Sequence, residues 1–186
     1  MKKLSLFIFL LFLFQFNSLK SDTKLKIIEN INSSESLKFD FIQSSFNNEE
    51  SGVCYLKRPH FLKCSYNDKK QKQLIINKKS LVILHKRYNK IYFYPLSKSY
   101  FLEILDKEKF SQLIDKGNLI LKKDFFEIEF YAENKGKIIF YFDRKKFDIS
   151  GWKIIDLNNN STNFQITNLD KNQEIDKKLF TIPSFN

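Results

Sequence analysis

The most regular feature of this chain is an alternation of hydrophobic and polar residues over many short segments. Between residues 125 and 131, for example, Phe126, Ile128 and Phe130 alternate with Glu127 and Glu129. Alternation with a period of two is typical of β-strands that have one buried face. Strands with this or a similar pattern are predicted over residues 37–46, 52–57, 61–66, 73–77, 81–85, 90–94, 119–121, 125–131, 137–143, 152–157 and 162–167. Turns are predicted over residues 47–50, 78–79, 134–136 and 158–160. So many short strands favour a barrel or a strongly curved sheet in a single domain.

Two segments show the period of a helix instead. Leu25, Ile28 and Ile31 recur every three residues after Asp22, which is expected to cap the first helix. Residues 107–116 form the second, with the apolar residues at 102–105 as a candidate extension. Two helices cannot cover both faces of such a sheet. Its concave side is therefore filled either by the helices alone or by helices that leave room for a ligand.

The aromatic content bears on this choice without deciding it. The chain has 21 Phe and 8 Tyr, more than a core of this size usually needs. Either compositional drift and an ordinary β core explain them, or they line a large apolar cavity.

The first residues have the layout of a secretory signal peptide. Lys2 and Lys3 precede an apolar run over residues 4–14, which is too short to span a bilayer comfortably, and small residues follow at Ser18 and Ser21. We therefore predict a signal peptide over residues 1–21 and one domain over residues 22–186. The alternative is an uncleaved membrane anchor. No cysteine lies near the cleavage region, which argues against a lipid-anchored lipoprotein.

A hairpin holds both cysteines of the chain. If the segment from Gly52 to Tyr66 reverses at Arg58-Pro59-His60, residue numbers across the ladder sum to about 118. Cys54 then faces Cys64 and Leu56 faces Leu62, on one apolar face with Arg58 at its rim. Because an exported chain permits disulfides, we predict a Cys54–Cys64 bridge. The alternative is a pair of small buried hydrophobic residues.

The charge of the chain points to no specific partner. The net charge is +11, but nearly all of the basic residues are lysine, as compositional drift would produce. We therefore expect no nucleic-acid partner, while a weak attraction to an anionic membrane surface remains an alternative.

The sequence contains no recognisable catalytic constellation. With two histidines and four glycines, no Ser-His-Asp set, metal cluster or phosphate loop is predicted. Glu127 and Glu129 are expected on the solvated face of their strand rather than as paired catalytic carboxylates. We therefore expect neither enzymatic activity nor a cofactor.

Several ordered segments together resemble the LolA family of periplasmic outer-membrane lipoprotein carriers. They are Phe41-x-Gln43, Gly52-x-x-x-Leu56-Lys57-Arg58-Pro59, Leu74-Ile75-Ile76-Asn77 with Leu81-Val82-Ile83, Tyr94-Pro95-Leu96, Ile154-Ile155-Asp156 and Leu179-Phe180-Thr181-Ile182-Pro183. Two departures stand out: Cys64 occupies the place of a usual Trp, and Asn77-Lys78-Lys79 the place of a usual Asp-Gly turn. The first bears on the packing of the cavity wall, whereas the second is a surface turn.

The resemblance implies a mainly β fold with short helices, an unclosed antiparallel β-barrel of about eleven strands with a helical lid over its concave face. It also implies that Arg58 hydrogen-bonds carbonyls of the lid and so favours the closed, empty form. By periodicity, the acyl-chain cavity would be lined by Phe41, Leu56, Leu62, Ile75 and Ile83 on the sheet side and by Ile27 and Ile31 on the lid side.

The implied function is that of a periplasmic chaperone, acting as a monomer, which binds lipoproteins by their acyl chains. Its implied partners are an inner-membrane ABC exporter complex and an outer-membrane lipoprotein receptor. One alternative is a periplasmic module of the same fold that senses or binds a lipid, lipoprotein or peptide. The membrane-anchored acceptor of the pathway is a further alternative, but the chain lacks the cysteine for lipid attachment.

Overall fold

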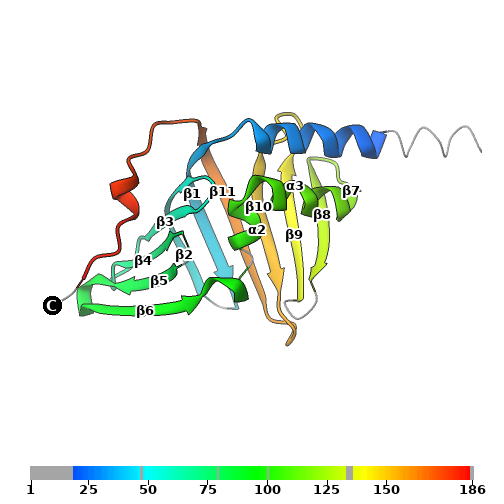
Figure 1. Cartoon of the computed structure of the whole chain (residues 1–186). Coiled ribbons are helices and arrows are strands. Elements are labelled where there is room, and N and C mark those ends of the chain that lie inside the picture. Colours follow the sequence, from blue (N-terminus) through cyan, green and yellow to red (C-terminus); the bar gives the residue numbers. More distant parts are fainter. Residues whose placement is uncertain (1–18, 47, 79, 100, 133–135, 185–186) are drawn as a thin grey trace, which may run out of the picture.

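The protein is built on one antiparallel sheet of eleven strands (Figure 1). The computed structural model describes residues 19–46, 48–78, 80–99, 101–132 and 136–184. The strand order is β6-β5-β4-β3-β2-β1-β11-β10-β9-β8-β7, so the sheet is not closed and β6 and β7 form its two edges. The strands are β1 (Ser36–Ser45), β2 (Asn48–Lys57), β3 (Phe61–Tyr66), β4 (Lys72–Asn77), β5 (Ser80–His85), β6 (Lys90–Pro95), β7 (Asn118–Leu121), β8 (Phe125–Ala132), β9 (Gly136–Asp143), β10 (Ile149–Ile155) and β11 (Ser161–Lys171). The predicted fold class is thus confirmed.

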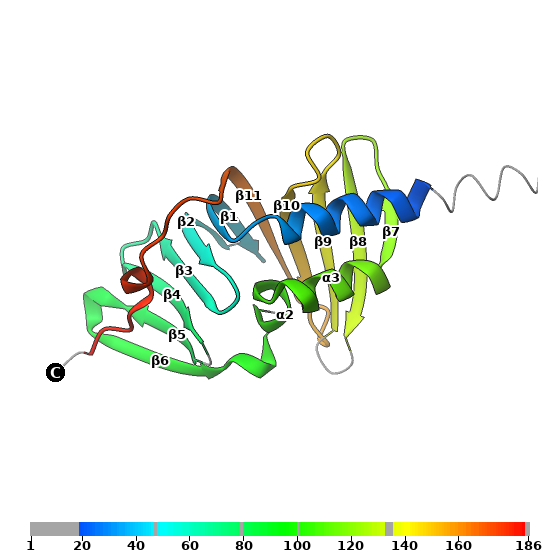
Figure 2. The ribbon, with the colours of Figure 1, turned by 45° about the horizontal axis from the view of Figure 1, so that its top comes forward.

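The helices gather over one half of the sheet. The N-terminal helix (residues 19–32) and α3 (Lys107–Lys116) lie side by side across β8, β9 and β10, and the short α2 (Phe101–Leu105) lies nearer the middle (Figures 1 and 2). Their apolar residues join the core on the inner face, where Ile27, Ile114 and Phe140 are fully buried. None of the described residues forms such a helical layer over the half made of β3–β6.

The chain after β11 covers the outer face of that other half. The short helix η3 (Lys177–Phe180) contacts β3 and β4. The ring of Phe180 is fully buried and lies 5.3 Å from the ring of Phe61, and Asn77 Nδ2 donates to the Phe180 carbonyl at 3.0 Å. Next to it Ile182 packs on a second, smaller apolar cluster that is separate from the inner core.

Removing the Phe180 ring should therefore destabilise the fold. We expect Phe180→Ala to lower the free energy of unfolding by about 3–5 kcal/mol, the usual cost of a buried Phe truncation. Urea unfolding followed by circular dichroism would measure it. The matched variant Leu179→Ala, at a partly exposed neighbour, should cost clearly less. Equal costs would show that the C-terminal segment contributes no specific packing.

Two local predictions were wrong. Residues 48–50 belong to β2 rather than to a turn, because Asn48, Glu49 and Glu50 pair with residues of β1 and Glu50 forms an ion pair with Lys72. The turn falls at Phe46, which has φ 50°. Asp22 does not cap the first helix, because the chain is already helical at residue 19, and its carboxylate instead pairs with Lys26 one turn later at 2.6 Å.

The predicted division into a leader and a domain stays a prediction. Residues 1–18 of the expected signal peptide lie outside the described residues. None of the helices in the described part of the chain combines the length and apolar character needed to cross a bilayer.

Candidate functional site

The hairpin of β2 and β3 has the predicted register. Cys54 faces Cys64, Leu56 faces Leu62, and the two sulfur atoms form a disulfide. The turn contains a cis peptide bond between Arg58 and Pro59. The disulfide and the two leucines are buried, so this hairpin forms a wall of the inner face.

The disulfide should contribute measurably to stability. It closes a separation of 10 residues, for which the chain-entropy estimate is about 2–3 kcal/mol. We expect Cys54→Ala/Cys64→Ala to lower the melting temperature by about 5–10 °C in a domain of this size. Thermal unfolding with and without reductant is the measurement. Reductant should shift the wild type and leave the double variant unchanged, and an unshifted wild type would contradict the expectation.

A row of aromatic rings forms the floor of the inner face. The ring of Phe164 stacks on Phe41 at 4.8 Å and on Trp152 at 4.1 Å, and Phe41 meets Tyr66 edge-on at 4.9 Å. Gly52 makes room for this row, since a Cβ there would lie 2.9 Å from the Phe41 ring and 2.0 Å from a backbone oxygen of β3. The four rings give the centre of the sheet a rigid apolar surface.

An apolar cavity of about 260 Å³ lies over this floor. Its wall includes the disulfide, and it reaches from β10 and β11 across β1 to β5. The lining residues are Phe39, Gln43, Cys54, Leu62, Cys64, Tyr66, Lys72, Leu74, Ile83, Trp152, Ile154, Thr162 and Phe164. The residues are predominantly apolar, with Lys72 and Gln43 among the few polar ones, so the cavity suits an apolar ligand better than a polar one.

The helices α2 and α3 form a lid beside this cavity. Ile104, Leu105 and Phe110 point into the sheet and leave under them only a small void of about 20 Å³. The void shares Phe39, Leu62 and Trp152 with the larger cavity, so the two are neighbours. The lid thus occupies with its own side chains the space next to the open cavity.

Arg58 ties this lid to the sheet. Its Nη1 donates to the carbonyl oxygens of Ile104 at 2.7 Å and Leu105 at 2.8 Å, at the end of α2. These carbonyls lie where a helix leaves its acceptors unpaired, so a charged donor satisfies them well. The guanidinium carbon also lies 6.0 Å from the centre of the Phe110 ring in α3. One side chain of the hairpin therefore contacts both lid helices.

Burial of the Arg58 guanidinium has an electrostatic cost. Arg58 is only 8% exposed, and burial lowers its pKa to about 10, while the charges of Glu35 and Asp106 partly counteract this. The side chain therefore stays charged at neutral pH. Its Nε is buried and has no hydrogen-bond partner among the described residues. An unsatisfied buried donor costs free energy, so the closed arrangement is held by less than the two hydrogen bonds would give alone.

A second tie joins α3 to the segment before β1. Lys107 forms an ion pair with Glu35 and donates to the Asn32 carbonyl at 2.7 Å. The Arg58 backbone N–H donates to the Glu35 carbonyl at 3.0 Å, so both ties meet at this segment. The Lys107 contact is exposed to solvent at Glu35, and such pairs contribute little. Arg58 is therefore the stronger of the two.

The structure brings some of the predicted cavity residues together. Leu56 and Leu62 line the void under the lid, and Leu62 and Ile83 line the larger cavity. Phe41 lines neither space, but its ring stacks on the lining residue Phe164. On the lid side, Ile27 and Ile31 are buried in the same core but line neither of these two spaces.

The prediction that Ile75 lines the cavity is wrong. It pairs with Val82, whereas Ile83 pairs with Leu74, and directly paired residues share a face. Ile75 and Ile83 therefore lie on opposite faces. Ile75 belongs to the outer cluster under Ile182, so its burial comes from the C-terminal segment and not from the cavity.

Other lining residues were not predicted. Phe39 shares its face with Phe41 by simple alternation and could have been found from the sequence. Trp152 and Phe164 required the pairing of β10 with β11, and Ile104 and Leu105 required the placement of α2, none of which a local pattern reveals.

Neither a metal site nor a pair of free catalytic carboxylates is found among the described residues. No three His, Cys, Asp or Glu side chains among them lie close enough to hold a metal ion. Glu129 pairs with Lys137 at 2.5 Å and Glu127 with Lys122 at 3.3 Å, as expected for a solvated strand face. The cavity and its lid are therefore the candidate site.

Comparisons with known proteins agree with this geometry. The sequence profile of the family described as "Outer membrane lipoprotein carrier protein LolA" matches residues 32–183. No curated protein matches the sequence.

Among solved structures, an uncharacterized conserved protein from Thermus thermophilus is similar with a TM-score of 0.54 at 8% identity, over 86% of this chain and 93% of that chain. The MucA/MucB complex of Pseudomonas aeruginosa is similar with a TM-score of 0.51 at 11% identity, over 88% of this chain and 61% of that chain. A DUF1329 family protein from Desulfovibrio piger is similar with a TM-score of 0.51 at 9% identity, over 88% of this chain and 96% of that chain. Identities this low indicate a shared fold alone.

Proposed function

This chain belongs to the LolA family of outer membrane lipoprotein carrier proteins, and on that premise we propose that it carries lipoproteins across the periplasm. It would shield their acyl chains between an inner-membrane ABC exporter and an outer-membrane receptor. The observation that carries the proposal is the apolar cavity beside a lid that Arg58 ties down. The three assignments of compartment, exporter and receptor rest on the family.

The cargo explains why such a cavity is needed. Burying an acyl chain gains roughly 0.8 kcal/mol per CH₂ group, so a lipoprotein with several chains cannot stay bare in water. The cavity of about 260 Å³ lies below the range of about 300–1,000 Å³ usual for small-molecule pockets. Cargo would therefore require α2 and α3 to move away from the sheet, which enlarges the cavity by the volume that Ile104, Leu105 and Phe110 now fill.

Release follows from the same arrangement. Opening breaks the two Arg58 hydrogen bonds and the packing of the lid, and this cost offsets part of the gain from acyl burial. The net affinity falls to a level from which a better acceptor can take the cargo. No nucleotide is needed for this step, because the cost of opening is returned when the empty lid closes.

A second candidate is a periplasmic module that binds a lipid or lipoprotein as a signal. The specific observation in its favour is that the fold is shared with MucB, which has been solved in a complex with MucA. Such a module would use the same cavity, but it would keep its ligand rather than pass it on.

Lipid extraction tests the shared part of both candidates. We expect the exported protein, purified without detergent, to yield acyl-chain lipid by mass spectrometry after incubation with membranes. The matched sample is the Ile83→Asp variant, which should yield much less. Finding no acyl lipid in either protein would argue against a carrier and a sensor alike.

A further inference from the structure

The net positive charge of the chain arises from one half of the sheet. Residues 51–100, which include most of β2 and all of β3–β6, hold 12 of the 32 Lys and Arg residues but only one of the 21 acidic residues, Asp68. This stretch therefore carries +11, the net charge of the whole chain, and the remaining 136 residues are neutral overall. Compositional drift would spread lysine along the chain without removing acidic residues from one stretch, so it does not account for this distribution.

Five of these basic residues form one exposed group, which we name the basic corner. It comprises Lys69 and Lys70 before β4, Lys86 and Arg87 in the short helix η1 (Lys86–Tyr88), and Lys90 at the start of β6. The two loops are held together, since the backbone N–H groups of Lys86 and Arg87 donate to carbonyls of the 67–71 loop at 3.5 and 3.3 Å. The basic side chains are therefore gathered by the fold and not only by the sequence.

The basic corner forms no ion pair within the part of the chain that the structure describes. Asp68, in the same loop as Lys69 and Lys70, accepts a hydrogen bond from the backbone N–H of Lys72 at 2.9 Å, and Glu50 is paired with the Lys72 side chain. On the neighbouring strand, the pKa of Lys63 is lowered by burial and further by the charge of Lys86. The charge of this region is thus left for an external partner.

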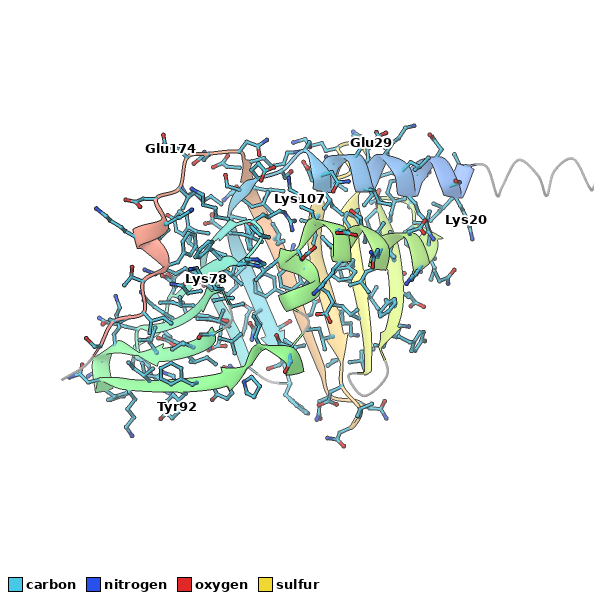
Figure 3. All side chains as sticks on the ribbon, viewed as in Figure 1. Lys20, Glu29, Lys78, Tyr92, Lys107 and Glu174 are labelled. Carbon is cyan, nitrogen blue, oxygen red and sulfur yellow. A yellow bond between two sulfur atoms is a disulfide. The ribbon has the colours of Figure 1, made fainter. Side chains whose placement is uncertain are left out.

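Exposed aromatic residues continue from the basic corner along the free edge of the sheet. Tyr88 is 53% exposed, Tyr92 41%, Phe93 68% and Tyr94 46%. Tyr88 lies in η1, and the other three alternate between the two faces of β6, because Tyr92 and Tyr94 pair with residues of the cavity face and Phe93 pairs with Val82 of the outer face. Figure 3 shows Tyr92 at the outer rim of the sheet, far from the N-terminal helix and α3. We name these four residues the aromatic edge.

We propose that the basic corner and the aromatic edge together dock the protein on the surface of an anionic lipid bilayer. Lysines attract the anionic headgroups, and Tyr rings are enriched where water meets the hydrocarbon layer. Tyr92 pairs with Ile83, which lines the cavity, so docking by this edge would bring the cavity next to the membrane.

The composition favours lipid over the other anionic partners. Ten of the 12 basic residues in this half are lysine, whereas tight phosphate recognition in nucleic acids favours the planar fork of arginine. An acidic protein face would also attract the basic corner, but it would not explain aromatic side chains on both faces of an edge strand. The proposal is independent of the carrier function, because it concerns the outer rim of the sheet and not the cavity.

Vesicle cosedimentation of the exported protein tests it. We expect strong binding to phosphatidylcholine vesicles that contain phosphatidylglycerol, little binding to phosphatidylcholine alone, and release by salt. Lys69→Gln/Lys86→Gln/Lys90→Gln should weaken binding by about 100-fold, from roughly fivefold for each lysine. The control Lys116→Gln/Lys123→Gln/Lys145→Gln changes the net charge equally at exposed sites of the other half and should have little effect. Phe93→Ser, at a side chain that is 68% exposed, should weaken binding more than Phe46→Ser, at a Phe elsewhere that is 84% exposed.

Three results would overturn the proposal. Equal losses in the two triple variants would mean that net charge and not the basic corner decides binding. Binding that resists salt would mean that lipid enters the cavity instead. Absence of vesicle binding together with lysine-dependent binding to polyglutamate would assign the surface to an acidic protein. The first and third results would not bear on acyl-chain transport, which bare vesicles do not test, whereas the second would support the cavity as an acyl-chain site.

Discussion

Replacing Arg58 by leucine should make the protein hold its acyl-chain ligand about 30- to 100-fold more tightly. The substitution removes two hydrogen bonds from a charged donor to the carbonyls of Ile104 and Leu105. Each such bond is worth about 1.5–3 kcal/mol, and the relieved burial of the guanidinium returns part of this sum. A net loss of about 2–2.7 kcal/mol from the closed state gives the stated range. Titration with a fluorescent triacylated lipopeptide would measure it, and transfer from the variant to acceptor vesicles should slow in proportion.

The chain offers a matched control for this variant. Nη1 of Arg144 likewise donates to two successive carbonyls, those of Lys122 and Lys123, at 2.7 and 3.0 Å, but away from α2 and α3. Arg144→Leu should leave ligand affinity unchanged. Arg58→Lys should lie between the wild type and Arg58→Leu, because lysine keeps the charge but loses the guanidinium geometry. Transfer from Arg58→Leu at the wild-type rate or faster would contradict the role of Arg58 as a tie on the lid.

An Ile83→Asp substitution should weaken acyl-chain binding by at least about 100-fold. Ile83 lines the cavity, and a carboxylate there must either stay ionised against the acyl chain or take up a proton, each at a cost of several kcal/mol. The same lipopeptide titration measures the loss, together with circular dichroism to establish that the variant is folded.

Ile155→Asp is the control for Ile83→Asp. Ile155 is also partly buried, but it follows the lining residue Ile154 along β10 and so faces the other side of the sheet. It should bind as the wild type does. If both variants lost affinity alike, the loss would reflect a general disturbance of the sheet, and the cavity would not be the binding site.

Local patterns predicted the sheet well because the alternation of apolar and polar residues is visible within each single strand. The hairpin of β2 and β3 is the clearest case, since one turn at Arg58-Pro59 fixes the opposition of Cys54 with Cys64 and of Leu56 with Leu62. The same holds for α3, whose three buried residues lie at helical spacing. In these elements the residues that form the sequence pattern and the residues that they contact lie within about ten positions of each other.

What the sequence could not provide depends on contacts between distant segments. Ile75 and Ile76 are both fully buried, one on each face of β4, so a strand covered on both sides has no alternation to read. The cover on the outer side comes from Ile182, more than a hundred residues later. The pairing of β1 with β11 likewise joins the first and the last strand of the chain. The cavity floor of Phe41, Phe164 and Trp152 forms only because of this pairing.

A carrier must lift lipoproteins out of a membrane, and a release assay tests most directly whether this protein does so. Membranes loaded with a radiolabelled, triacylated lipoprotein are incubated with the protein lacking the predicted leader, residues 1–21, and are then sedimented. The supernatant is separated by size. We predict a soluble one-to-one complex of protein and lipoprotein that disappears with Ile83→Asp and passes its cargo to fresh vesicles more slowly with Arg58→Leu. If the labelled lipoprotein stays in the pellet at every concentration of the wild-type protein, the protein is not a carrier.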